Sequence, residues 1–379
     1  MGNNTYIRGQ KELMEEVHDT GLCTGCGACV NLCPYYATSM DKTVVKDVCD
    51  RAAGRCYAFC PRTPTDLESI RKKLFDPQDL TPELGAVKGF YLTRASDPDI
   101  RSMAQHGGTV TTLMSLALAE GIIDTALLAE GGGSRLPRGV AVGDAREVPK
   151  MAKSKFIAAP MVEAFNMAAQ SDAQKIGIVA TPCQTLALAK MKMKPFPKND
   201  NQIGKLQLTI GLFCGWVLSW RSFEQLLHQK IHEQAVVSLD IPPSKYKTMQ
   251  VETAGGLVEI PLDEVEACVR EACKFCTDVT AEFSDISVGS ARLPDGWEVA
   301  KGWNQVIVRT AAGEALMQLA KDRQALEFRD VPDGNLEKLK QASVKKKKTA
   351  LDNLACKSGD RNDLLYLDCR DPVFQTFDW

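Results

Sequence analysis

Cysteine is the residue type in this sequence whose number and spacing could do chemistry. The chain has 379 residues, with 14 cysteines and 4 histidines. Disulfides explain such a count in a small secreted domain, but a chain of this length that begins with charged rather than apolar residues is expected in a reducing compartment. The shortage of histidine favours ligation by thiolates alone. The composition therefore predicts metal or redox chemistry.

The first cysteines have the spacing of a bacterial ferredoxin. The run C-x2-C-x2-C-x3-C-P comprises Cys23, Cys26, Cys29, Cys33 and Pro34. Such a run holds a [4Fe-4S] cube, and its fourth cysteine usually serves a second cluster. Gly25 and Gly27 suit the tight loop because glycine accepts positive φ. The first cube is therefore predicted to be bound by a first cysteine group, defined as Cys23, Cys26, Cys29 and Cys60.

The other cysteines of this region make an incomplete set. This second cysteine group consists of Cys33, Cys49 and Cys56. Cys56 and Cys60 have the spacing that ends a ferredoxin run, but one cysteine precedes them where two are expected. The second site therefore takes a ligand other than cysteine, holds an incomplete cluster, or is absent. Zinc is the alternative for the whole region, and it is disfavoured because zinc knuckles use paired C-x2-C half-sites.

The later cysteines are scattered: Cys183, Cys214, Cys268, Cys273, Cys276, Cys356 and Cys369. The spacing C-x4-C-x2-C between 268 and 276 could indicate a plant-type [2Fe-2S] site. Against this, residues 262–272 have the pattern of an amphipathic helix, which can bury Cys268 as a small hydrophobic residue. Spacing alone leaves open which of these cysteines bind a cluster.

Strands and helices alternate from residue 89 onward. Strands are predicted at 90–93, 125–129, 175–180 and 206–213, and helices at 100–105, 110–120 (capped by Thr109), 184–193 and 222–231. This alternation predicts an α/β body with a mostly parallel or mixed sheet, in which ligands collect at the carboxyl ends of strands. Cys183 and Cys214 each follow a predicted strand, so we expect them in a site rather than in the core.

Glycines offer weaker signals. Gly107 and Gly108 precede a predicted helix start, where a pyrophosphate is plausible, although spacing alone favours an ordinary loop. Residues 131–134 are predicted to be a flexible loop rather than a phosphate cradle. No G-x-G-x-x-G follows a predicted strand, which counts against a Rossmann site.

Charge and hydropathy exclude other functions. The 46 basic and 48 acidic residues give a net charge of -2, which excludes a broadly basic surface for nucleic acid. The most apolar stretch, 113–128, contains charges and glycine, so no membrane span and a cytoplasmic location are expected. In the tail, 345–348 is a four-lysine run expected on a solvated helix face, and Phe374, Phe377 and Trp379 are expected to anchor the end on this chain or on a partner.

Several strings in order resemble one family, the beta subunits of coenzyme F420 hydrogenase and dehydrogenase. The strings are Ala104-Gln105-His106-Gly107-Gly108, Glu120-Gly121-Ile122-Ile123-Asp124, Ser154-Lys155-Phe156, Thr181-Pro182-Cys183-Gln184, Gly211-Leu212-Phe213-Cys214, Cys273-Lys274-Phe275-Cys276-Thr277-Asp278, Asp285-Ile286-Ser287-Val288-Gly289 and Asp295-Gly296-Trp297. The likeness covers roughly residues 88 to 325. The N-terminal extension resembles the ferredoxin-type domain of longer members such as formate dehydrogenase beta subunits.

The resemblance implies an α/β (α+β) flavoprotein body with mixed sheets, preceded by a small ferredoxin-like iron–sulfur domain. Four regions are expected: a ferredoxin-type domain at 1–65, a linker at 66–88, a domain for FAD and a [4Fe-4S] cluster at 89–330, and a helical and extended tail at 331–379. By resemblance, the body's cluster is bound by a third cysteine group: Cys183, Cys214, Cys273 and Cys276. By the same resemblance, FAD contacts Gly107, Gly108, Thr109, Ser154, Lys155, Thr181, Gln184 and Lys245. No acid–base residue is assigned.

The implied function is that of an electron-transfer oxidoreductase subunit. FAD would exchange a hydride with coenzyme F420 or a similar carrier, and two or three [4Fe-4S] clusters would pass single electrons to a partner. That partner would be a formate dehydrogenase, hydrogenase or heterodisulfide-reductase subunit, or ferredoxin. The alternative is a stand-alone reductase that takes electrons from ferredoxin and reduces a small organic substrate. A third interpretation is a wiring module whose flavin site is empty.

Overall fold

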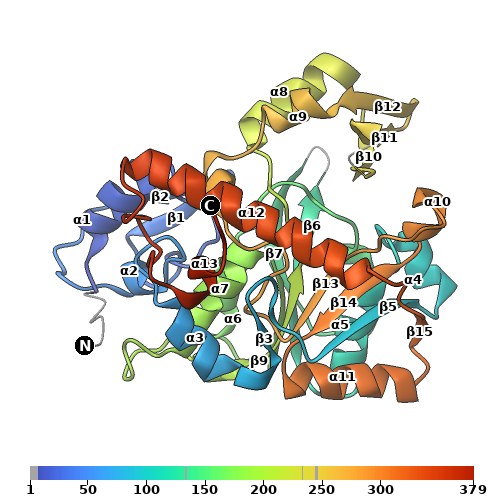
Figure 1. Ribbon diagram of the computed structural model, residues 1–379, viewed down its shortest axis with the longest axis horizontal. Coiled ribbons are helices and arrows are strands. Elements are labelled where there is room, and N and C mark those ends of the chain that lie inside the picture. The colour runs from blue at the N-terminus through green and yellow to red at the C-terminus, as the bar shows by residue number, and fades with distance from the viewer. Residues whose placement is uncertain (1–6, 133–134, 233, 244–245) are drawn as a thin grey trace.

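The fold is organised around an eight-stranded sheet (Figure 1). The computed structural model describes residues 7–132, 135–232, 234–243 and 246–379. The strand order is β15-β5-β14-β13-β9-β8-β6-β7, in which β13, β9, β8 and β6 run parallel and the flanking strands are antiparallel to their neighbours. The predicted mixed α/β body is therefore confirmed. The strands are β5 Gly89–Ala95, β6 Thr125–Gly132, β7 Arg135–Val142, β8 Ile176–Ala180, β9 Leu206–Leu212, β13 Ile286–Ser290, β14 Asn304–Val308 and β15 Leu326–Arg329.

Helices cover both faces of this sheet, which explains why its central strands are apolar on both sides. Alternate residues of β6 point to opposite faces. Leu127 packs with helices α6 and α7, whereas Ala126 and Leu128 pack with α5 and α11. The helices of the body are α4 Pro98–Met103, α5 Thr109–Ala119, α6 Met161–Ala168, α7 Pro182–Lys192, α10 Trp297–Ala300 and α11 Ala311–Asp322, with 3-10 helices at Ala145–Met151 and Ile203–Lys205.

The predicted strands and helices of the body are confirmed to within three residues at their ends, with three corrections. Residues 131–132, predicted to begin a flexible loop, are the last two residues of β6, and 133–134 lie outside the described residues. Thr109 does not cap α5. The cap is Gly108, whose φ of 82° is in the left-handed region that glycine tolerates, and Thr109 is the first helical residue. The helix predicted over 262–272 stops at Glu266, because Val269 pairs with Leu218 in an isolated bridge and the chain there must be extended.

A second, smaller sheet lies apart from the main one, at the top of Figure 1, and its strands were not predicted. This satellite sheet has the order β10-β11-β12 and is antiparallel throughout. Its elements are α8 Trp220–Ile231, β10 Val236–Asp240, β11 Thr248–Thr253, β12 Gly256–Pro261 and α9 Leu262–Glu266. It has a hydrophobic core of its own, built around the buried side chains of Phe223, Met249 and Ile260.

The N-terminal region packs beside the main sheet, on the left of Figure 1. Its buried residues share two hydrophobic clusters with the body, one of which contains Ala28, Phe59 and residues of α6 and α7. The elements are α1 Gln10–Leu13, a π-helix at Met14–His18, β1 Tyr36–Ser39, β2 Lys42–Val45, α2 Arg55–Phe59, α3 Leu67–Leu74, a 3-10 helix at Pro77–Asp79, β3 Leu80–Thr81 and β4 Gly85–Ala86.

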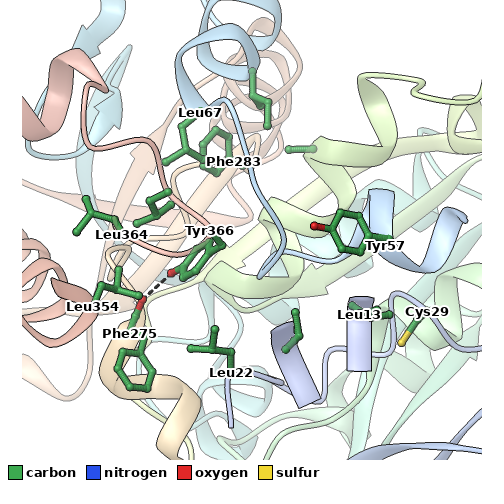
Figure 2. Close-up of a cluster of buried hydrophobic side chains, with 14 of the residues drawn as sticks. Leu13, Leu22, Cys29, Tyr57, Leu67, Phe275, Phe283, Leu354, Leu364 and Tyr366 are labelled. Carbon is green, nitrogen blue, oxygen red and sulfur yellow. Dashed lines mark hydrogen bonds between the residues drawn. The ribbon is translucent and has the colours of Figure 1, made fainter. Parts of the chain in front are cut away.

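The C-terminal segment joins the two regions. Helix α12 Asn335–Ser358 runs across the body to the N-terminal region, and α13 Pro372–Gln375 follows it (Figure 1). Figure 2 shows the cluster in which side chains of the tail meet those of both regions, including Tyr366, whose hydroxyl donates to the Phe275 carbonyl at 2.5 Å. Phe374 is 1% exposed and belongs to this cluster, so this predicted anchor docks on its own chain.

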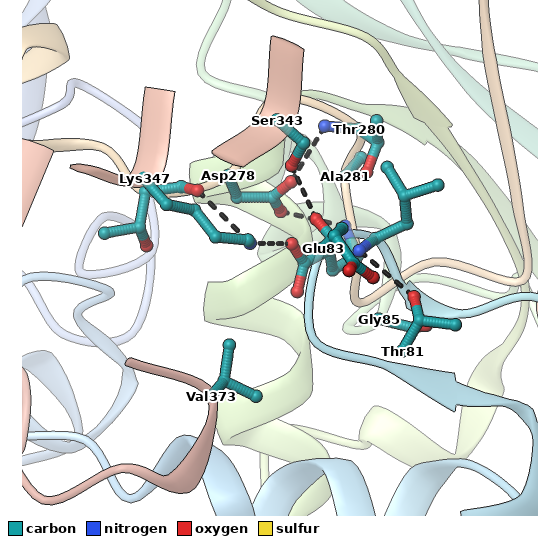
Figure 3. Close-up of polar contacts among 12 residues, drawn as sticks. Thr81, Glu83, Gly85, Asp278, Thr280, Ala281, Ser343, Lys347 and Val373 are labelled. Atoms are coloured by element: carbon teal, nitrogen blue, oxygen red, sulfur yellow. Dashed lines mark hydrogen bonds and ion pairs between the residues drawn. The ribbon is translucent and has the colours of Figure 1, made fainter. Parts of the chain in front are cut away.

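The four-lysine run on α12 is not a uniformly solvated face, so that expectation was wrong for one of its residues. Lys345 is exposed, but Lys347 is 2% exposed and pairs with the buried carboxylate of Glu282. Figure 3 shows Lys347 beside Asp278, and Ser343, one turn earlier on α12, donates to the Glu83 carbonyl at 2.6 Å. Among the described residues, no helix has the length and apolarity needed to cross a membrane.

Candidate redox site

Cysteines of the third group lie at the carboxyl edge of the parallel strands. Cys183 is the second residue of α7, directly after β8, and Cys214 follows the end of the neighbouring strand β9. Because β8 and β9 are parallel, their carboxyl ends meet at one edge of the sheet. Cys273 lies in the 3-10 helix η6 Glu271–Phe275, and Cys276 ends that helix.

The four thiols of the third group lie within electrostatic range of one another. Burial is the main cause that raises the pKa of Cys214, and the thiols of Cys273, Cys183 and Cys276 raise it further, against Lys346, which lowers it. Burial likewise raises the pKa of Cys183, with Cys276 next. The structure therefore brings together the third group, whose members lie up to 93 positions apart in the sequence. Cys268 is not among them, because it packs in the core of the satellite sheet.

The surroundings of the third group fit a [4Fe-4S] cluster. Four thiols without histidine are the donor set of such a cube, whose sulfur ligands sit at separate corners. Within the described ranges, no three His, Cys, Asp or Glu side chains converge as they would on a single metal ion. The backbone N–H of Val217 donates to the Cys273 sulfur at 3.4 Å, the kind of bond that tunes a cluster's potential.

Gly211 allows two segments that carry third-group cysteines to pack closely against each other. A Cβ on Gly211, in β9, would lie 2.4 Å from the Ala281 Cβ and 2.7 Å from the Ser284 hydroxyl. Only glycine therefore allows the segment after Cys276 to approach the strand that leads to Cys214. Asp278 stabilises the same segment by accepting hydrogen bonds from the N–H groups of Thr280 and Glu282 at 2.9 and 2.8 Å.

The first cysteine group also comes together. Burial raises the pKa of Cys29, followed by the effect of the thiols of Cys26, Cys23 and Cys60. Gly25 and Gly27 have φ values of 69° and 80°, as the ferredoxin spacing predicts for a loop that wraps a cube. In the second group, burial raises the pKa of Cys56 to about 11, and the thiols of Cys33 and Cys49 are also close enough to act on it.

The three cysteine groups are neighbours in space, in the order second, first, third. Cys29 of the first group is within electrostatic range of Cys56 of the second. On its other side, Cys26 is within range of Cys183 of the third group, and the Thr24 hydroxyl hydrogen-bonds to Cys183. The first group therefore lies between the second and the third.

Two buried arginines fix this arrangement. Arg62 donates to the carbonyls of Ala272 and Phe275, on either side of Cys273, at 3.1 and 3.0 Å. Arg270 donates to the Cys23 carbonyl at 3.2 Å and pairs with the Asp41 carboxylate at 2.7 Å. Because each guanidinium links backbone next to a first-group cysteine with backbone next to Cys273, the two groups are held at a fixed separation.

The glycine turn predicted to contact a flavin is tightly packed. A Cβ on Gly107 would lie 2.8 Å from the Asn304 Oδ1. Thr109 is fully buried, with its hydroxyl 2.8 Å from that of Thr93, so its side chain serves the fold. Between Gln105 and Gly107, the buried Nδ1 of His106 has no hydrogen-bond partner in the part of the chain that the structure describes.

Other predicted flavin residues lie along the same edge of the sheet. Lys155 is near Glu130 at the end of β6, and burial lowers its pKa, with Lys153 as the next cause. Lys153 and Phe156 have φ values of 75° and 56°, and such strain in residues other than glycine is typical of ligand-binding loops. Ser154 is exposed, and its N–H donates to the Gln105 side chain at 3.3 Å.

The last three predicted residues differ in what they offer. Thr181 caps α7 together with Gln184, whose Oε1 accepts from the Thr181 N–H at 2.8 Å. The Gln184 amide also donates to Ala159, so the fold uses both ends of this side chain. The Thr181 hydroxyl lies 3.5 Å from the Cys183 sulfur. Lys245 lies outside the described residues.

A polar cavity of about 460 Å³ opens between this loop region and the satellite sheet. Its body side includes Gln105 and Lys153, and its satellite side includes Asp240 and Glu252. Gln105 bridges the two sides by donating to the Asp240 carboxylate at 2.7 Å. The volume is that of a cofactor or substrate pocket. The satellite side of this cavity was not predicted from the sequence, although the alternating residues on either side of the turn at 254–255 are typical of a hairpin.

The fold and the cysteine groups define a class: an iron–sulfur protein with a mixed α/β body. Comparison with known proteins agrees. The family profile for the C terminus of the coenzyme F420 hydrogenase/dehydrogenase beta subunit matches residues 173–334, the profile for its N-terminal part matches 90–166, and a 4Fe-4S binding domain matches 16–38. The chain belongs to the coenzyme F420 hydrogenase/dehydrogenase beta subunit family, and it carries a ferredoxin-type 4Fe-4S domain.

Individual relatives place it more closely. The coenzyme F420 hydrogenase subunit beta of Methanothermobacter thermautotrophicus is 31% identical over 72% of this chain and 96% of that protein. The coenzyme F420-dependent sulfite reductase of Methanocaldococcus jannaschii is 28% identical over 88% of this chain, which spans half of that protein. A chain of the F420-reducing [NiFe] hydrogenase complex from Methanosarcina barkeri aligns with a TM-score of 0.65 and 26% identity, covering 73% of this chain and 95% of that one. These relatives are oxidoreductases or their subunits.

Proposed function

We propose that this chain is an electron-transfer subunit in which FAD exchanges a hydride with coenzyme F420 and the cysteine groups carry single electrons to a partner. The observation that supports it most is the link between the first and third groups: Arg62 and Arg270 join backbone beside one group to backbone beside the other, and Cys26 is within electrostatic range of Cys183. A cluster in the body is useful to a partner only if electrons can leave it, and the first group supplies that exit. The partner is proposed to be a formate dehydrogenase, hydrogenase or heterodisulfide-reductase subunit.

The residues along the sheet edge suit a flavin. When bound, FAD accepts two electrons as a hydride and releases them one at a time. Lys153 supplies positive charge in the wall of the cavity, and Lys155 lies two residues further along the same loop. Among the described residues, the unpartnered His106 Nδ1 adds a buried polar atom close to the Gly107 turn. Thr181 is proposed to contact the flavin, and its hydroxyl lies 3.5 Å from the Cys183 sulfur, so a flavin held there would lie beside the third group. The cavity faces the satellite sheet, which we propose covers the hydride partner.

The direct test is to purify the protein without oxygen and measure its flavin, its iron and its reaction with reduced coenzyme F420. We expect bound FAD and about eight or more iron atoms per chain. We also expect the flavin absorbance to bleach when the protein is mixed with reduced coenzyme F420. Zinc with neither flavin nor iron would refute the proposal. Turnover of a small organic substrate with reduced ferredoxin by the isolated monomer, and no reaction with coenzyme F420, would support the stand-alone reductase instead.

The Lys155→Met variant is expected to bind FAD about tenfold more weakly, because it removes one charged donor from the sheet edge, a contact worth about 1.4 kcal/mol. Equilibrium titration of the flavin-free protein measures this. Lys150→Met is the matched control, since Lys150 lies on the preceding 3-10 helix and pairs with Glu147 at the surface. Equal FAD affinity in both variants would show that Lys155 does not contact the flavin, and no FAD binding by wild type or variants would favour the wiring module with an empty flavin site.

The Lys346→Gln variant is expected to make the third-group cluster harder to reduce. The Lys346 ammonium contacts the carbonyls of Cys214 and Gly215 and acts on the Cys214 thiol. Loss of one positive charge worth about 1 kcal/mol lowers the midpoint potential by roughly 40 mV. A redox titration followed by electron paramagnetic resonance (EPR) measures it, and Lys345→Gln, at an exposed position, should leave the potential unchanged.

A further inference from the structure

The second cysteine group lacks a fourth thiolate at a specific place. Counting back from Cys60 and Cys56 with ferredoxin spacing, the two missing cysteines fall on positions 53 and 50, which are Ala53 and Asp50. Cys49 is the only thiol that precedes Cys56 in this segment. The group therefore offers three thiolates to a cluster that has four metal corners when complete.

A buried phenol lies near this group. Tyr36 is 4% exposed, and its hydroxyl has no nitrogen or oxygen partner among the residues described. The polar groups near it are thiols: it is within hydrogen-bonding reach of Cys56 and within electrostatic range of Cys29 of the first group and Cys33 of the second. A buried hydroxyl left without such a partner is rare and requires an explanation. The sulfide of an inorganic cluster bound by the three thiolates would offer this hydroxyl a hydrogen-bond acceptor.

The approach to this group is open on the Cys49 side. Cys33 and Cys49 are half-buried and Cys56 is buried, and the residue before Cys49, Val48, is 81% exposed. In the first group, Cys23 and Cys60 are half-buried and Cys26 and Cys29 are buried. Arg55 lies close to Cys33 and Cys56 and donates to the Leu32 carbonyl at 2.6 Å, so the group is flanked by positive charge that favours bound thiolates. Iron can therefore reach the second group from solvent.

We infer that Cys33, Cys49 and Cys56 hold a cluster with one exchangeable iron, at the corner that has no thiolate. A one-electron oxidant converts the cube to the three-iron form: [4Fe-4S]2+ gives [3Fe-4S]+, Fe2+ and one electron, which the oxidant accepts. After one-electron reduction of the three-iron form, [3Fe-4S]0 and Fe2+ combine to give [4Fe-4S]2+. The inference rests on the ferredoxin-type domain and not on the flavin.

The experiment uses the full chain, purified without oxygen and treated with one equivalent of ferricyanide. We expect loss of one iron per chain and the EPR signal of an oxidised three-iron cluster, and we expect both changes to reverse on addition of dithionite and Fe2+. Retention of all iron with no three-iron signal would overturn the inference. So would an iron count that leaves no cluster for this group.

Variants assign the signal to this group. Ala53→Cys restores a thiol at ferredoxin spacing on an exposed position, and it should lower the three-iron signal at least tenfold. An undiminished signal in this variant would place the exchangeable corner elsewhere and overturn the assignment. Tyr36→Phe should keep the reversible conversion, because the three thiolates and not the phenol bind the cluster, and loss of the cluster would contradict this. FAD content and reaction with coenzyme F420 are measured in parallel, so failure of the flavin proposal would be seen separately.

Discussion

The Cys273→Ser variant is expected to lose about four iron atoms per chain and to reduce its N-terminal clusters at least a hundredfold more slowly when the flavin is reduced. Cys273 lies between Ala272 and Phe275, whose carbonyls accept hydrogen bonds from Arg62. Changes to groups that merely surround metal ligands cost 10–100-fold in affinity or activity, and loss of a ligand should cost at least as much. Iron analysis and stopped-flow spectroscopy with reduced coenzyme F420 measure the two effects.

Cys268→Ser is the matched control for this experiment. Cys268 lies five positions earlier and is buried, but its thiol donates to the Glu264 carbonyl within the satellite core. Serine can make the same bond, so iron content and rates should stay near those of the wild type. If Cys268→Ser lost iron and Cys273→Ser did not, the third group as defined here would be wrong.

The Lys347→Met variant is expected to lower the free energy of unfolding by about 3–5 kcal/mol. Lys347 and Glu282 form a buried ion pair, and removing one partner leaves the other charge uncompensated. Asp278 is half-buried beside this pair; desolvation followed by the charge of Glu282 raises its pKa, and the charge of Lys347 opposes that rise. Urea unfolding of the loaded protein without oxygen measures the loss.

Two further variants separate this effect from a general effect of α12. Lys345→Met removes a charge from the same helix at an exposed position and should change stability by less than about 0.5 kcal/mol. The double variant Lys347→Met with Glu282→Leu replaces the ion pair by apolar side chains and should recover at least half of the loss. Equal destabilisation by Lys345→Met and Lys347→Met would show that the buried pair is not its source.

The features that depend on the geometry of one short segment could be predicted from the spacing of residues within that segment. The first group was assigned from a run of four cysteines and one distant partner, because a loop that short has few ways to wrap a cube, and the structure places Gly25 and Gly27 in the left-handed region as that loop requires. The strands that lead to Cys183 and Cys214 were also predicted, because a buried parallel strand is a continuous apolar run between turn residues.

Contacts between distant segments could not be predicted in the same way. Arg62 was not singled out, since nothing near it in the sequence indicates that its guanidinium bonds to carbonyls more than 200 positions away. Lys347 looked like any lysine in a polar helix until α12 was seen to place it against Glu282. The membership of the third group followed from the family resemblance, because spacing alone did not exclude Cys268.

Helix α12 touches the backbone beside third-group cysteines from two sides, through Lys346 at Cys214 and through Asn353, which donates to the Lys274 carbonyl at 2.9 Å. This helix follows all four third-group cysteines in the sequence, so a ribosome makes those thiols first. An emerging chain therefore carries the complete third group before α12 can dock beside Cys214 and Lys274.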